Sequence, residues 1–191
     1  MSESAITKKA IADGFRSLME KRAFEKITIS DITSSCGLNR QTFYYHFQDK
    51  YELLNWIFYN EIINPLTKNY TIDTWSDGLL QMLHVFKNNA KFYTNALNTS
   101  YSNEFRSYLF AATTNIFIDI LDQFPQSTAT LSTADKRFIA EFLSYGVTGS
   151  IINWILTGMK ESPENIVLRI KNLINDSNSG TVARYLRTTL S

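Results

Sequence analysis

The stretch NRQTFYYHF, residues 39–47, places an arginine, a glutamine and a histidine among four aromatic residues. It follows TISDITSSCGL (28–38), in which Thr28 and Asp31 have the spacing of a capping box. Gly37 suits the left-handed residue that ends a helix. These signals predict a short helix beginning at Thr28, a turn at Gly37 and another helix over about 40–47. Two helices joined by about four residues around a glycine form a helix-turn-helix.

The nine residues separate into three faces when they are placed on a helix at about 100° per residue. Phe43 and Phe47 are four positions apart and share the side that we expect to be buried. Thr42 and His46 form one flank. The outward arc carries the other polar and aromatic side chains, which are Arg40, Gln41, Tyr44 and Tyr45.

This arc has the chemistry of a DNA-reading surface. Arginine and glutamine side chains read guanine and adenine edges in the major groove. Hydroxyl, phenol, imidazole and ammonium groups suit phosphate oxygens, and the free amides at the helix start near Thr28 could add a phosphate contact. A solvated amphipathic helix is the alternative, although such faces normally carry Lys and Glu rather than two tyrosines. The residues alone leave both interpretations open.

The rest of the chain predicts an all-α fold, because apolar residues recur at helical spacing and only three prolines and seven glycines interrupt them. We expect an N-terminal three-helix DNA-binding domain with a helix-turn-helix over residues 1–48. A larger helical domain for effector binding and dimerisation is expected over 49–191. The further helices are predicted over about 6–19, 49–58, 75–88, 91–98, 101–124, 133–157 and 163–174.

Composition excludes several classes of protein. The single cysteine, Cys36, excludes an internal disulfide and a thiolate-rich zinc site, and it fits a reducing compartment. No signal peptide begins the sequence and no apolar run approaches the roughly 20 residues of a membrane span, so we expect a cytoplasmic protein without a membrane partner. His46 and His84 are the only histidines, and no HExxH, GxGxxG, GxxxxGK[ST] or GxSxG motif occurs. We therefore expect no enzyme activity, cofactor or metal.

The run TISDITSSCGLNRQTFYYHFQDKYELL, residues 28–54, resembles the signature of the tetracycline-repressor (TetR/AcrR) family of bacterial transcription regulators. The resemblance covers about residues 5–60. It implies that Arg40, Gln41 and Tyr44 face bases. It also implies phosphate contacts from a second set of side chains, namely Thr28, Thr42, Tyr45, His46 and Lys50. Family members vary most at Arg40 and Gln41, so the resemblance does not predict the operator sequence.

The segment RQTFY (40–44) is similar to a branch that regulates dihydroxyacetone-kinase operons. The family as a whole implies a repressor that binds a palindromic double-stranded DNA operator as a homodimer and responds to a ligand or partner. This branch implies instead an activator that depends on a kinase-like partner protein. A helical interaction module without a specific operator is the further alternative.

The predicted helix over 133–157 is apolar nearly all round, and Gly146, Gly149 and Ser150 give it a patch of small residues. Together with the last helix it suggests a four-helix bundle between two copies of the chain. We call the predicted helix over 40–47 the reading helix. Aromatic residues between this bundle and the reading helix either line a cavity for a small amphipathic ligand or form a packed core. The sequence assigns no ligand-binding residue, and the effector stays unknown.

Overall fold

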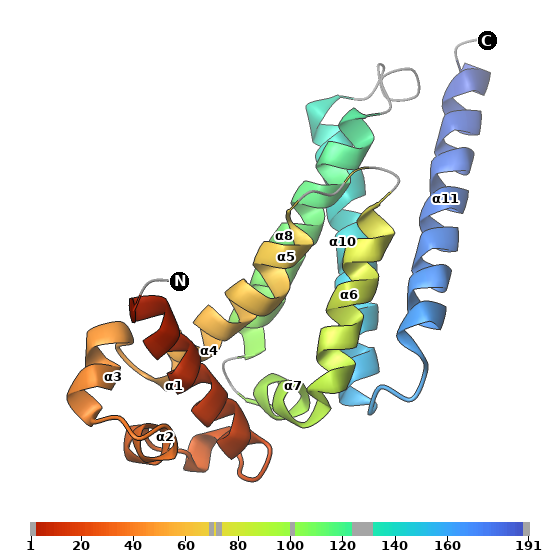
Figure 1. Ribbon diagram of the computed structural model, residues 1–191. Coiled ribbons are helices and arrows are strands. Elements are labelled where there is room, and N and C mark those ends of the chain that lie inside the picture. Colours follow the sequence, from red (N-terminus) through yellow and green to blue (C-terminus); the bar gives the residue numbers. More distant parts are fainter. Residues whose placement is uncertain (1–2, 69–70, 72–73, 100–101, 124–131, 189–191) are drawn as a thin grey trace.

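Every regular element that the computed structural model describes is a helix (Figure 1). The described residues are 3–68, 71, 74–99, 102–123 and 132–188. The all-α prediction is therefore confirmed. A small group of N-terminal helices lies at one end of the molecule, and longer helices extend away from it (Figure 1).

The N-terminal group is the predicted helix-turn-helix with a helix ahead of it. Helix α1 packs on both α2 and α3. A side chain at Gly14 of α1 would clash with the hydroxyl of Ser35, so the glycine permits the close approach of α1 and α2. Gly37 has a φ of 68°, which is the left-handed conformation expected of the residue that ends α2. The elements are α1 (Glu3–Met19), the 3-10 helix η1 (Phe24–Lys26), α2 (Ile29–Ser35) and α3 (Arg40–His46).

The connecting helix is longer than the sequence predicted. Helix α4 (Lys50–Phe58) passes into a π-helical turn, η2 (Tyr59–Ile63), and then into α5 (Asn64–Leu66). Pro65 is compatible with helix here because it lies in the first turn of α5. Ile57, Phe58 and Ile62 are buried, so the core of the larger domain continues through the π turn.

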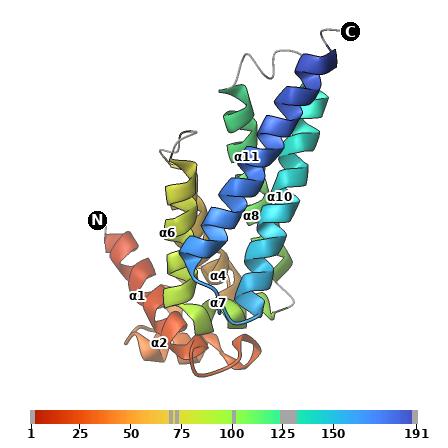
Figure 2. The ribbon, with the colours of Figure 1, turned by 90° about the vertical axis from the view of Figure 1, so that its right-hand side faces the viewer.

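The larger domain is built on α8 and α10, which run side by side (Figures 1 and 2). Helix α11 packs on α6 and extends beyond the predicted end near Ile174, through the segment DSNSGT. Gly158 has a φ of 90° after α10, as expected for a helix-ending glycine. The elements are α6 (Trp75–Asn88), α7 (Ala90–Leu97), α8 (Ser102–Asp122), α10 (Thr133–Leu156) and α11 (Pro163–Thr188).

Helix α10 is long and apolar enough to cross a membrane by length and composition alone, although no uninterrupted apolar run of that length was expected. Core helices pass the same test, and Ile151, Trp154 and Ile155 of α10 are buried inside the protein. The apolar character of α10 is therefore explained in part by packing on α8.

Candidate nucleic-acid interface

Two phenylalanines fix the orientation of α3. Phe43 and Phe47 are 0% and 2% exposed, and their ring centroids lie 5.8 Å apart. Phe47 also packs edge-on against Trp56 of α4 at 5.9 Å. Burial of each ring is worth roughly 1.5–3 kcal/mol, so rotation of α3 about its axis would be costly. The predicted anchoring of the helix is confirmed.

The opposite side of α3 carries the outward arc expected from the sequence. Arg40 and Gln41 are exposed, and Tyr44 and Tyr45 are 49% and 83% exposed. The guanidinium of Arg40 donates to the hydroxyl of Tyr44 at 3.4 Å, one turn along the helix. The structure thus brings the four side chains together on one surface, and none of them is packed inside the protein.

Of the residues predicted to contact phosphates, Tyr45 belongs to this arc, and three others lie on α3 or at the start of α2. Thr42 and His46 are half-buried on the flank of α3, and Thr28 is exposed at the start of α2. The Thr28 hydroxyl accepts from the backbone N–H of Asp31 at 3.2 Å and donates to its carboxylate at 2.7 Å. The predicted capping box is therefore present.

The carboxylate of Asp31 holds the start of α2 in place. It accepts from the hydroxyl and the backbone N–H of Thr28, and it forms an ion pair with Arg22 at 3.0 Å. The hydrogen bonds from Thr28, and then the interaction with Arg22, lower the pKa of Asp31 to about 2.

Two further caps were not predicted from the sequence. Asn39 caps α3 by accepting from the backbone N–H of Thr42 at 2.8 Å, and Asp49 caps α4 by accepting from two backbone N–H groups. Asn and Asp immediately before a helical run are a recognised N-cap signal, so both could have been found. Asn39 sets the start of α3, and Asp49 sets the start of α4, the connecting helix.

The structure places Lys50 differently from the other predicted phosphate contacts. Its ammonium donates to the carbonyl oxygens of Phe24, Glu25 and Ile27 at 2.9, 3.3 and 2.9 Å. It also lies 4.4 Å from the centre of the Phe24 ring. An ammonium has three N–H donors, so in this conformation none is left for a phosphate. Burial of this group lowers its pKa.

The aromatic residues between the reading helix and α10 form a packed cluster in the described part of the chain. Phe86, Phe92, Tyr93 and Phe105 are each 0% exposed. Phe58 contacts three of them, with ring centroids 4.2–6.4 Å apart. These contacts favour the packed-core alternative for these residues.

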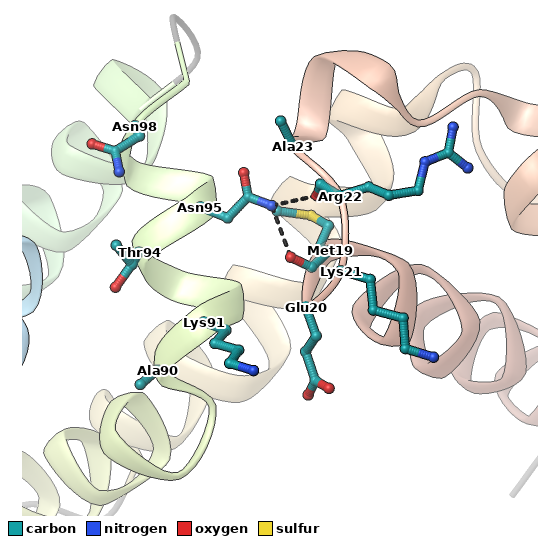
Figure 3. Close-up of a pocket in the computed structure, with 10 residues that line it drawn as sticks. All are labelled: Met19, Glu20, Lys21, Arg22, Ala23, Ala90, Lys91, Thr94, Asn95 and Asn98. Atoms are coloured by element: carbon teal, nitrogen blue, oxygen red, sulfur yellow. Dashed lines mark hydrogen bonds between the residues drawn. The ribbon is translucent and has the colours of Figure 1, made fainter.

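A surface cleft of about 500 Å³ lies at the joint between the two domains, where the end of α1 faces α7 (Figure 3). Asn95 of α7 spans it, and its amide donates to the carbonyl oxygens of Met19 and Arg22 (Figure 3). Lys91, Thr94 and further side chains line the cleft around this contact. Among the described residues, no group of three His, Cys, Asp or Glu side chains could hold a metal ion.

Comparisons with known proteins agree with this arrangement. A family model described as "Bacterial regulatory proteins, tetR family" matches residues 11–57, and one described as "Transcriptional regulator C-terminal region" matches residues 73–176. The HTH-type dhaKLM operon transcriptional activator DhaS of Lactococcus lactis subsp. lactis (strain IL1403) is 30% identical over 175 residues, which are 91% of each chain.

Solved structures extend the likeness to the whole fold. That of the dihydroxyacetone kinase operon activator DhaS has 29% identity and a TM-score of 0.76, and the match covers 92% of this chain and 97% of that one. FadR from Bacillus subtilis, solved with stearoyl-CoA, is 16% identical, with a TM-score of 0.63 over 86% of this chain and 96% of that one. The resemblance to the branch of dihydroxyacetone-kinase operon regulators is confirmed. These relatives are regulators rather than enzymes, and the chain belongs to the tetR family of bacterial transcriptional regulators.

Proposed function

We propose that the protein is a sequence-specific regulator that inserts α3 into the major groove of a double-stranded operator. Arg40, Gln41 and Tyr44 would contact base edges, and Tyr45 lies beside them for the sugar–phosphate backbone. The observation that carries this proposal is the exposed arc on α3 directly behind the buried rings of Phe43 and Phe47.

Three further groups suit phosphate oxygens in this arrangement. Thr42 and His46 lie on the flank of α3, and Thr28 caps α2. We assign Lys50 to the support of the motif rather than to a phosphate, because its donors are occupied by carbonyl oxygens.

A homodimer is supported by an uncovered apolar stripe on α10. Phe138, Phe142, Tyr145 and Leu156 are 70%, 69%, 69% and 40% exposed, and they recur at the spacing of one helix face. Gly149 lies on the same stripe, and a side chain added there would meet nothing within 4 Å. Large exposed apolar patches mark interaction surfaces.

The neighbouring helix α11 also exposes apolar side chains. Leu168 and Leu173 of α11 are 56% and 68% exposed. Two copies of α10 and α11 would form a four-helix bundle with twofold symmetry, and the two reading helices would then face successive turns of a palindromic operator. Such a protein acts in the cytoplasm, where its DNA is.

The names of the relatives bear on the direction of regulation that we propose. Both DhaS matches are named as activators, which favours activation over the repression expected from the family as a whole. Control would come from a ligand or a partner protein that binds the larger domain with different affinity in its DNA-competent and incompetent arrangements.

The test is a footprint of the purified full-length protein on the DNA upstream of its own gene, followed by titrations at several salt concentrations. Arg40→Ala should weaken the protected site by about 5- to 150-fold, which corresponds to 1–3 kcal/mol, and relax its base preference. Ser34→Ala, an exposed change on α2, is the control. Equal and weak binding to every duplex would instead support the helical interaction module.

A further inference from the structure

We infer that α7 and the π turn hold the helix-turn-helix domain at a fixed angle to the larger domain, through Asn95 and an Arg16–Glu61–Tyr93 cluster. Asn95 and Tyr93 are then positioning residues for DNA binding. This inference rests on the proposed function, because the angle it concerns is that of the reading helix.

The first of the two attachments is Asn95. Its side-chain nitrogen donates to the carbonyl oxygens of Met19 and Arg22, both at 2.8 Å (Figure 3). Its side-chain oxygen accepts from the backbone N–H of Phe24 at 3.2 Å. The last carbonyl groups of a helix have no partner within it. A side chain of the larger domain therefore caps α1 and orders the turn that leads to η1.

The second attachment lies one turn back along α1. The guanidinium of Arg16 forms an ion pair with Glu61 of the π turn and donates to the side chain of Asn89 at 3.2 Å. It also stacks over the Phe92 ring at 4.8 Å. The second carboxylate oxygen of Glu61 accepts from the hydroxyl of Tyr93 at 3.1 Å.

Burial makes this cluster more than a surface contact. The side chains of Arg16 and Glu61 are 15% and 33% exposed, and Tyr93 is fully buried. Burial and then the charge of Glu61 raise the pKa of Tyr93 well above its usual value. Burial alone would lower the pKa of Arg16, but the hydrogen bond and charge of Glu61 more than offset this and raise it.

Together the two attachments prevent α1 from pivoting on α7, which a single attachment would allow. Arg16 of α1 and the Met19–Phe24 segment that follows the end of α1 are both held against α7. Phe15 adds an edge-on ring contact with Phe92 at 6.4 Å. Helix α1 therefore cannot pivot on α7 without breaking one of them. The N-terminal domain must move with α7, so a rearrangement of α7 changes the direction of α3.

The π turn explains how Glu61 reaches this position. One additional residue per turn rotates the side chains that follow it relative to an uninterrupted α-helix. Glu61 lies inside the Tyr59–Ile63 turn, and each of its carboxylate oxygens has a partner, one in the DNA-binding domain and one in the larger domain.

The test measures the angle between the domains without DNA. In the full-length chain with Cys36→Ser, dyes attached at Ser34→Cys on α2 and Gln81→Cys on α6 report the distance by single-molecule energy transfer. Labelled chains are mixed with a large excess of unlabelled chains, so that only distances within one chain are measured. Both positions are exposed in the structure.

Asn95→Ala should broaden or shift the distance distribution and weaken operator binding by about 5- to 150-fold, the usual range for coupling between sites. Asn98→Ala is the matched control, because Asn98 is an exposed asparagine of the same cleft. It should change neither quantity. Tyr93→Phe, which removes one hydrogen bond and keeps the ring, should give a smaller broadening and serves if Asn95→Ala does not fold.

An unchanged distance distribution in Asn95→Ala and Tyr93→Phe would overturn the inference, even if the unaltered protein binds its operator. A broadened distribution in a protein that binds no operator would refute the proposed function and leave the attachment of the domains established. The two failures are therefore distinguishable.

Discussion

Replacement of Lys50 by methionine removes the charge from the loop ahead of α2 while it keeps most of the volume of the side chain. Three carbonyl oxygens then lose the ammonium that donates to them at 2.9, 3.3 and 2.9 Å, and that of Phe24 keeps the backbone N–H of Ile27. A hydrogen bond to a charged group contributes about 1.5–3 kcal/mol when buried. Lys50 is only half-buried and water can replace part of what is lost, so we expect a loss of about 1–2 kcal/mol in the free energy of unfolding.

Chemical denaturation monitored by circular dichroism measures this loss, with Lys68→Met, an exposed lysine of the connecting region, as the control. DNA titrations over a series of salt concentrations supply the second measurement. Loss of one phosphate contact lowers the slope of log affinity against log salt concentration by about 0.9. We expect an unchanged slope for Lys50→Met. A variant of unaltered stability whose slope falls by about one would refute the structural role and restore the phosphate contact.

Three further changes test the fold and the assembly. The carboxylate of Asp31 has a pKa of about 2, below its ordinary 3.8, so it contributes stability that is present above pH 3.8 and is lost as pH falls toward 2. Asp31→Asn should therefore flatten the plot of unfolding free energy against pH in this range, as measured by urea unfolding, and parallel plots for the two proteins would contradict the capping role. Phe43→Ala should cost about 3–5 kcal/mol in the same measurement, and a loss below 1 kcal/mol would show that α3 is anchored otherwise. If the proposed dimer forms through α10, Phe142→Glu should give monomers in sedimentation velocity, whereas Tyr59→Glu, an exposed aromatic outside α10, should leave the dimer intact.

Short-range signals explain how much of the reading motif could be predicted. The Thr28–Asp31 box, the Gly37 turn and the Phe43–Phe47 pair each depend on residues at most four positions apart. Local backbone geometry brings such residues together whenever the helix forms, so their spacing predicts their contact. The exposed arc on α3 follows from the same periodicity, and the structure places it as predicted.

Local signals were wrong where a helix was already established. The last helix was expected to end near Ile174, ahead of the segment DSNSGT (176–181), yet α11 continues to Thr188. Serine, asparagine and glycine each cost only about 0.5–1 kcal/mol within a helix, and extension of an existing helix avoids the cost of nucleation. The same reasoning applies beyond Phe58, where packing of Ile62 carries the helix through a π turn.

The sequence by itself determined the class of the fold, the reading helix and the side chains that face outward from it. Only the tertiary structure decided that Lys50 supports the loop at Phe24, that Asn95 caps α1 and that Arg16 meets Glu61, across 26, 76 and 45 positions of sequence. The physical reason is that each contact joins residues far apart in sequence, which meet only when the chain folds. Judged only from its neighbours in sequence, each of these three residues is an ordinary polar residue on a helix.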